Sequence, residues 1–269
     1  MESELESLLG WKVAAVALWL ALFFAAERML PAAAEPAETG PAEGPAQGWG
    51  RWRRVARNLS LWLVNLPLSL LVVVPVTQWS SATAPAWRPE WWSGWGGLLL
   101  DLLLLDFLIY WWHRANHGWP PLWRFHAVHH LDRFLDSTSA LRFHFGEVFL
   151  SALARAAAIL ALGFPLASVL VFETLLLLAT IFHHSNLRLP GALERALSWI
   201  VVTPSIHWLH HHRVRRDTDS NYATILSLWD RLFGTRNPGR RRPEMAIGVE
   251  GEEEETAGAL LLRPFKRAG

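Results

Sequence analysis

The sequence contains no cysteine, and this absence excludes several kinds of structure at once. Disulfide bonds, iron–sulfur clusters, cysteine-ligated zinc and thiolate-ligated haem all need a thiol. Any bound metal must therefore be held by nitrogen and oxygen ligands. Charge is also sparse, because only 18% of the 269 residues are charged and the net charge is +1, whereas 52% are hydrophobic. This balance is more apolar than that of a typical soluble domain.

Five apolar segments dominate the chain. They cover roughly residues 9–30, 59–76, 95–112, 148–162 and 166–182. A spanning helix needs about 20 apolar residues, which the first three segments approach or exceed. The last two are short and are separated only by residues 163–165, so we expect a hairpin and leave open whether it crosses the bilayer fully. The sequence predicts an all-α, polytopic membrane helical bundle with four or five membrane segments.

Composition changes along the chain predict its organisation. We expect an N-terminal transmembrane helix over residues 1–30, a flexible loop rich in proline, alanine and glycine over 31–50, a membrane-embedded catalytic domain over 51–240, and a disordered tail over 241–269. The acidic start, MESELESLLG, does not fit a cleavable signal peptide. No internal repeat is visible.

The distribution of arginine predicts the topology. The loop over residues 77–94 carries only Arg88, whereas arginines surround every histidine group and precede the second apolar segment. Most of the 17 tryptophans lie where apolar segments end, as in the aromatic belts of membrane proteins. We therefore expect a multi-pass integral membrane protein with a histidine-rich cap on the cytoplasmic face. The high use of alanine, tryptophan and arginine favours a bacterial inner membrane.

All 12 histidines lie between positions 113 and 212, mostly at the ends of apolar segments. Residues separated by three or four positions share one face of a helix. This spacing groups eight candidate metal ligands, namely His113 and His117, then His126, His129 and His130, then His207, His210 and His211. Eight imidazoles exceed what one ion needs, so two metal ions are the economical interpretation. Imidazole ligands suit iron, zinc, copper or nickel.

Further residues are candidates for the same centre. His183 and His184 point about 100° apart on a helix; His184 is slightly preferred as a ligand, and both can bind. His144 is a candidate for the metal or its surroundings. Asp106 lies two turns before His113 in an apolar segment, and Glu147 follows His144 by three residues. We expect these two carboxylates to orient ligand imidazoles by hydrogen bonding.

Several motifs, in order, resemble the fatty acid hydroxylase superfamily, also called the sterol desaturase family. The motifs are DFLIYWWHRANH, RFHAVHH, HSNLRLP, TPSIHWLHHH and NYATILSLWDRLFGT, within residues 95–237. The resemblance implies a non-haem di-iron centre held by the eight histidines and by His183 or His184, with O₂ as co-substrate. It also singles out Asn221, Tyr222, Trp229 and Asp230 as a structural motif. The chain has Phe145 and Ala223 where the family has proline and glycine, so both local turns are expected to differ.

The expected activity is hydroxylation or desaturation of C–H bonds in a membrane lipid, as part of lipid biosynthesis. Side chains alone do not cleave such bonds, so a metal–oxygen oxidant is needed. We expect two irons, with zinc an alternative occupant in purified protein. No flavin or cytochrome b5-like motif is visible, which implies a separate donor such as a ferredoxin, a cytochrome b5-like protein or a reductase. No nucleic-acid partner is expected.

Two rival functions follow from the same residues. A membrane di-zinc hydrolase would use the histidines to activate water, although such sites often include a bridging carboxylate and the histidine motifs contain none. A non-enzymatic metal-binding or transport protein would place its ligands near the bilayer midplane, whereas these lie at one face.

The lipid is expected to enter sideways from the bilayer, between the third segment and the 148–182 hairpin.

Overall fold

The computed structural model describes residues 2–35 and 50–266, and these form an all-helical structure without extended strands. The expected loop over 31–50 lies mostly outside the described residues. The helices, in chain order, are α1 (Glu2–Met29), α2 (Gly50–Leu68), η2 (Ser69–Val73), α3 (Val74–Thr83), α4 (Gly94–Gly118), α5 (Pro120–His130), η3 (Ser137–Leu141), α6 (Phe145–Leu162), α7 (Leu166–His184), α8 (Gly191–Leu197), α9 (Pro204–His210), α10 (Arg215–Thr218), α11 (Leu228–Leu232), α12 (Ala257–Leu262) and η4 (Arg263–Phe265).

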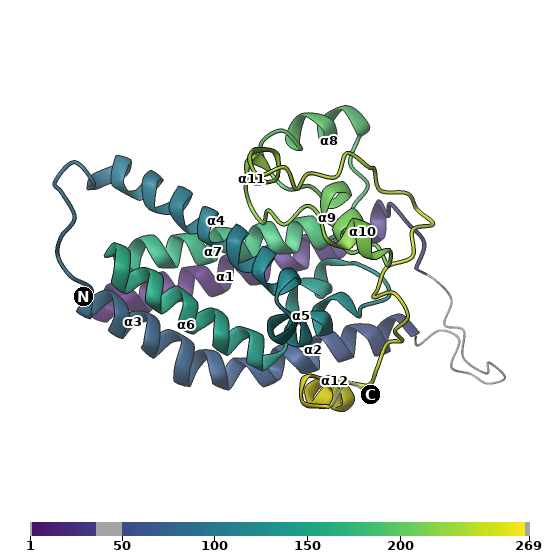
Figure 1. The fold of residues 1–269 in the computed structure, drawn as a ribbon, viewed down its shortest axis with the longest axis horizontal. Coiled ribbons are helices and arrows are strands. Elements are labelled where there is room, and N and C mark those ends of the chain that lie inside the picture. Colours follow the sequence, from purple (N-terminus) through teal and green to yellow (C-terminus); the bar gives the residue numbers. More distant parts are fainter. Residues whose placement is uncertain (1, 36–49, 267–269) are drawn as a thin grey trace.

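Five helical stretches are long and apolar enough to cross a membrane. They are Leu9–Met29, Trp52–Thr83, Gly94–Gly118, Phe145–Leu162 and Leu166–His184. The prediction of a polytopic helical bundle is therefore confirmed. Figure 1 shows these stretches running along the long axis of the molecule, with the short helices α8 to α11 at one side and end. All the histidine-bearing segments meet in this region, which we call the cap.

Local sequence explains where the helices begin and end. Helices α5 and α9 each begin with proline. The fixed φ of proline suits the first helical position, and the backbone N–H that proline lacks would have no acceptor within the helix there. Gly163 ends α6 in the left-handed conformation, with φ 67°, which a residue without a Cβ adopts at no steric cost. Pro165 then begins α7 as its N-cap. The hairpin expected between α6 and α7 follows from these two residues.

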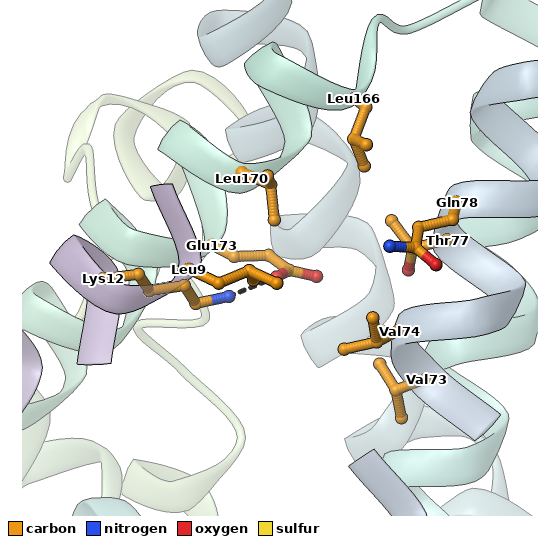
Figure 2. A pocket seen from close by; sticks show the side chains of 9 residues that line it. All are labelled: Leu9, Lys12, Val73, Val74, Thr77, Gln78, Leu166, Leu170 and Glu173. Carbon is orange, nitrogen blue, oxygen red and sulfur yellow. Dashed lines mark hydrogen bonds and ion pairs between the residues drawn. The ribbon is translucent and has the colours of Figure 1, made fainter. Parts of the chain in front are cut away.

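Charged side chains inside the bundle tie α1 to the other helices. Figure 2 shows the cavity between α1, α3 and α7, where Lys12 Nζ lies 2.5 Å from Glu173 Oε2. Arg155 of α6 reaches the same carboxylate at 3.3 Å. At the other end of α1, the Glu27 carboxylate accepts hydrogen bonds from the backbone amides of Ser137 and Asn186. These pairings offset the free-energy cost of placing charged side chains within the bilayer.

The tail differs from the expectation of disorder. In the part that the structure describes, residues 257–265 are helical, and Leu260 is fully buried against Leu61, Val128 and Leu131. The acidic run preceding α12 reaches several arginines, including a contact from Glu254 to Arg142 at 3.0 Å. The composition suggested a solvated charge run, but the basic partners lie far away in sequence and become neighbours only in the fold.

Candidate metal centre

Nine buried histidines meet where four helices end. His113 and His117 lie in the last turns of α4, three histidines lie in the last turns of α5, and His184 ends α7. The remaining three lie at the end of α9, as His207, His210 and its following residue His211. Eight of these residues are 4% exposed or less, and His113, taken as a whole residue, has intermediate exposure. The centre is therefore shielded from water by the cap.

The nine side chains form two groups. In each group the candidate ligand atoms all lie within 4.8 Å of one another. Group one consists of His113, His117, His126, His130 and His210, and group two consists of His129, His184, His207 and His211. Two sets of nitrogens at this spacing fit two separate metal ions. The structure thus brings together the eight histidines grouped by spacing, and adds His184.

Each of the two longer histidine motifs is divided between the groups. His126 and His130 share group one, whereas His129 belongs to group two. Likewise His207 and His211 share group two, whereas His210 belongs to group one. Residues four apart on a helix are offset by about 40°, but neighbours are offset by about 100°. Each of these two motifs therefore contributes histidines to both groups, and this holds the two groups side by side.

Hydrogen bonds outside group two fix the direction of its lone pairs. His129 Nδ1 donates to the carbonyl of Arg142 at 3.0 Å, and His184 Nδ1 donates to the carbonyl of Thr180 at 2.8 Å. A neutral imidazole that donates from Nδ1 has a bare lone pair on Nε2. The two Nε2 atoms face each other at 3.0 Å. Two lone pairs at this distance repel unless a cation lies between them.

The other close contacts in group two are also between Nε2 atoms. His207 Nε2 lies 3.0 Å from His184 Nε2 and 3.1 Å from His211 Nε2. A metal with bonds of about 2.1 Å separates neighbouring nitrogens by roughly 3.0 Å in an octahedron and roughly 3.4 Å in a tetrahedron. Burial also lowers the pKa of His129, His207 and His211 well below 6.5, which disfavours imidazolium. These residues therefore fit a metal cation.

Group one is oriented in a similar way. His113 Nδ1 donates to the carbonyl of Tyr222 at 2.8 Å, and His210 Nδ1 donates to the carbonyl of Ser220 at 2.6 Å. His126 Nδ1 lies 2.8 Å from Glu147 Oε1. His117 is buried, and neither of its ring nitrogens has a hydrogen-bond partner. Its Nδ1 lies 3.5 Å from Asp219 Oδ1, which is longer than a normal hydrogen bond. A buried imidazole without a hydrogen bond is costly, and a metal ion would satisfy it.

The two carboxylates expected to orient imidazoles behave differently. Glu147 does contact His126, and it also accepts from Asn116 Nδ2 at 3.3 Å. Asp106 instead accepts from Trp229 Nε1 at 2.8 Å and from the backbone amide of Leu226 at 3.1 Å. The interpretation of Asp106 as an imidazole partner is therefore corrected, because its side chain turns toward the 221–229 loop. It stabilises that loop rather than a histidine.

The 221–230 segment supports the centre through its backbone. Asp230 accepts from the amides of Tyr222 at 2.8 Å and Ala223 at 3.0 Å, so it fixes the peptide whose carbonyl orients His113. The left-handed residue of this turn is Asn221, with φ 55°. Asparagine tolerates this region better than most residues. Alanine at 223 is thus accommodated because the positive φ occurs two positions earlier.

His144 lies outside both groups. Its Nδ1 accepts from the backbone amide of Gly146 at 2.9 Å and caps α6, while its Nε2 lies 3.0 Å from the carbonyl of Leu261. Both ring nitrogens are therefore used, and the expectation of a metal role is corrected to one of helix capping.

His183 lies beside group two without belonging to it. Its ring centroid is 3.9 Å from that of His207, and its Nδ1 is buried without a hydrogen-bond partner. The structure thus favours His184 as the ligand of this pair. His212, which ends the last motif, pairs through Nδ1 with Asp217 at 2.7 Å and faces away from both groups.

One neighbour of the centre was missed from the sequence. The ring of Trp123 lies 5.1 Å from that of His117 and 5.4 Å from that of His130. Arg215 covers the indole at 4.5 Å and donates to the carbonyl of His117 at 3.2 Å. Trp123 also lines a surface cavity with Arg213 and Glu250. Trp123 precedes His126 by three residues and His130 by seven, so all three lie on one face of the helix. This spacing is the signal in the sequence that could have identified Trp123.

Removing the Glu147 carboxylate tests its role as an orienting group. We expect Glu147→Ala to lower metal affinity in group one by roughly 10- to 100-fold, because His126 loses the partner that fixes its tautomer. Glu147→Gln retains an acceptor oxygen and should lose less. Competition with a chelator, followed by elemental analysis, measures the effect. Equal affinity in Glu147→Ala and the parent protein would contradict this role.

We expect the metal-free protein to lose stability as the pH falls through 6.5. Burial lowers the pKa of His130 well below 6.5 and that of His210 to about 3. An unfolded chain takes up protons at these side chains below pH 6.5, whereas the folded chain does not. The free energy of unfolding therefore keeps its full value above pH 6.5. Below that pH it falls by roughly 1.4 kcal/mol per pH unit for each such histidine. Thermal unfolding of chelator-treated protein across this range measures the loss, and an unchanged midpoint would contradict it.

Comparison with known proteins places the chain in a family. A family model described as fatty acid hydroxylase matches residues 98–235. The ornithine lipid hydroxylase of Rhizobium tropici is 30% identical over 200 residues, which are 74% of this chain and 59% of that protein. The alkylglycerol monooxygenase of Xenopus tropicalis is 35% identical over 152 residues, which are 56% of this chain and 32% of that protein.

A third relative is the fatty acid hydroxylase vlmA of a Lecanicillium species, 30% identical over 162 residues. The chain spans 43% of that protein and less than two thirds of the other two. No solved structure matches the chain. The family model covers half of the chain and includes every histidine of groups one and two. The chain therefore belongs to the fatty acid hydroxylase family.

Proposed function

We propose that the protein is a membrane-bound, non-haem di-iron oxidoreductase that uses O₂ to hydroxylate a C–H bond of a lipid. The observation that carries this proposal is the pair of buried histidine groups, in which Nε2 atoms of neighbouring rings lie 3.0–3.2 Å apart. The relatives are lipid hydroxylases and monooxygenases by name. Desaturation needs the same oxidant and stays an alternative outcome.

Groups one and two would each hold one iron. Iron bound there would supply the redox chemistry that activates O₂ for attack on a C–H bond, which side chains alone do not provide. The histidines contribute five nitrogens in one group and four in the other. Up to six ligands is usual for iron, so neither group fills the coordination sphere. The protein's part is to position these nitrogens and to keep open positions between them.

The surrounding side chains keep this arrangement rigid. Glu147 and the carbonyls of Arg142, Tyr222 and Ser220 hold individual rings by hydrogen bonds from Nδ1. Such partners fix both the tautomer and the ring orientation. Burial of the ligand rings excludes bulk water, which protects reactive species from side reactions. No carboxylate belongs to either group, which favours iron–oxygen chemistry over a bridged di-zinc hydrolase.

We infer that the substrate is a lipid that presents a carbon near its headgroup. The histidine groups lie at helix ends, close to one face of the membrane rather than at its midplane. A carbon near the headgroup occupies this depth, whereas the end of an acyl chain lies near the bilayer centre. The lipid would approach laterally between α4 and the α6–α7 hairpin. This depth argument agrees with relatives named for ornithine lipids and alkylglycerols.

The proposal includes a cytoplasmic metal site and a separate electron donor. The arginines around the histidine motifs support the cytoplasmic orientation. The donor is expected to be a ferredoxin, a cytochrome b5-like protein or a reductase. Turnover by the purified protein with O₂ alone would overturn the need for that donor.

Elemental analysis of purified protein, combined with an oxygenation assay, tests the function. We expect about two irons per chain, O₂ uptake that depends on an added reductant, and a membrane lipid that gains one oxygen atom from labelled O₂. Two zinc ions persisting after iron-rich expression, with no O₂ uptake, would favour a hydrolase. A protein without metal, or one that transports metal without oxidising lipid, would contradict the proposal.

A further inference from the structure

The cap exposes large apolar side chains beside α8 and α11. Trp199 and Ile200 are each 63% exposed and Leu232 is 62% exposed, although soluble surfaces seldom gather such residues. Leu193 and Leu228 are also exposed in the same two segments. We call these five side chains the cap patch. They lie outside the five stretches that are long enough to span a membrane, so the spanning helices do not explain their exposure.

The two segments of the cap patch form one surface. The carbonyl of Ser198 accepts from Ser227 Oγ at 2.8 Å and from Arg231 Nη1 at 3.3 Å. Arg231 also donates to the carbonyl of Trp199. These bonds join the end of α8 to the start of α11, and Figure 1 shows the two helices as neighbours at the side of the bundle. The two segments that carry the apolar side chains therefore lie side by side in the cap.

This surface continues the lipid-facing side of α4. Phe107 packs against Trp229 with centroids 5.3 Å apart, and Trp111 packs against Phe233 at 5.1 Å. Trp111 is itself partly exposed on α4, at the end of the span nearest the histidines. Tryptophans concentrate where the acyl region of a bilayer meets the headgroups. The cap patch thus adjoins the membrane boundary at the depth that α4 fixes.

The charge around the cap patch is predominantly positive. Residues 188–200 and 226–236 contain four arginines, namely Arg188, Arg195, Arg231 and Arg236. The acidic residues in these ranges are Glu194 and Asp230, and both accept hydrogen bonds from backbone amides. The guanidinium groups of Arg231 and Arg236 lie over the Trp199 ring at 5.1 and 5.7 Å. Cations at the level of an interfacial tryptophan match anionic headgroups.

We propose that the cap patch is buried in the membrane interface and binds the headgroups of anionic phospholipids. The apolar side chains enter the boundary of the acyl region, and the arginines contact the phosphates, as in amphipathic segments that lie on a membrane. This contact fixes the tilt of the cap over the bilayer. Arg215 and Arg216 belong to α10, outside the cap patch, and are expected to face water. The inference does not depend on the reaction.

The absence of cysteine in the chain allows a direct depth measurement. Single cysteines at Ile200 and Leu232, labelled with a fluorophore in the full-length protein, are expected to be quenched by lipids brominated near the headgroup. Arg216→Cys, exposed on α10, is the matched control and should remain unquenched. Equal quenching at all three positions, or none at Ile200 and Leu232, would overturn the proposal. Two sites on separate segments guard against a local folding defect.

The arginines are tested by lipid composition. In nanodiscs with mixed neutral and phosphatidylglycerol lipids, Arg195→Gln with Arg236→Gln is expected to lower the preference for the anionic lipid by roughly tenfold. Arg124→Gln with Arg216→Gln removes the same charge elsewhere and should change it little. Equal effects of both pairs would contradict a specific patch. Rapid disulfide formation between two copies of Ile200→Cys would assign the surface to a second chain instead.

Discussion

Replacing His117 and His130 with alanine is expected to remove one metal ion and leave the other. Both side chains belong to group one, and neither is a member of group two. The replacement should lower the content from about two metals per chain to about one. The converse replacement of His207 and His211 should remove the ion of group two. Elemental analysis of the purified variants measures both numbers.

Lipid oxidation should fall below detection in both variants, because the proposed chemistry needs the two metals together. His212→Ala is the control, since this neighbouring side chain pairs with Asp217 and should retain full metal content and activity. Equal loss of both metals in either variant would mean that the groups fold as one unit. Retention of both metals in the variant of group one would show that these histidines are not ligands.

This division into groups marks the limit of what spacing alone predicts. The helical repeat identified the histidines that share a face, and it gave equal weight to separations of three and four residues. In the structure, His126 and His130 belong to group one, and His129 belongs to group two. The smaller angular offset between residues four apart, about 40° against about 60° for three apart, is consistent with this division. The pairing of histidines from α4, α7 and α9 is a property of the assembled bundle.

The apolar segments were predictable for a different reason. Long runs without charge report directly on transfer into a bilayer, and that property belongs to each segment separately. All five predicted segments overlap helical stretches that are long and apolar enough to span a membrane. By contrast, the sequence showed Asp106 as a charge in an apolar segment but gave no sign of its partner. That partner, Trp229, lies 123 residues away.

Backbone carbonyls were invisible to the sequence argument as well. The groups that orient His113, His129 and His210 are the carbonyls of Tyr222, Arg142 and Ser220. Every residue has a carbonyl, so residue type gives no signal for this role. Only the fold determines which carbonyls face a ligand ring. This explains why ligand candidates emerged from the sequence while most of the groups that hold them did not.

A buried ionic network lies behind group two. Arg54 is 4% exposed, and its guanidinium donates to Asp132 Oδ2 at 3.1 Å and to Asp136. Asn58 Nδ2 also donates to Asp132 at 3.1 Å. These bonds fix the segment that follows α5 and leads to Arg142, whose carbonyl orients His129. The network therefore connects α2 to the metal centre through a chain of contacts.

Arg54→Met is expected to destabilise the protein by about 3–5 kcal/mol, because it removes the nearest cation from the buried carboxylates of Asp132 and Asp136 and leaves Asp136 only the longer contact to Arg28 at 3.7 Å. Arg133→Met is the matched control. Arg133 is 46% exposed and pairs with the exposed Glu253, so its loss should cost no more than about 1 kcal/mol. Unfolding by denaturant in the same detergent compares the two variants.

Adding Asp132→Asn and Asp136→Asn to Arg54→Met separates two explanations of that loss. If uncompensated negative charge causes it, removing both charges should recover part of the stability. If the arginine side chain acts mainly by packing, the triple variant should be no more stable than Arg54→Met. Metal content gives an independent measure, since a displaced Arg142 carbonyl would release His129 from its hydrogen bond. Group two should then bind its ion more weakly than group one, which lies farther along the chain of contacts from Arg54.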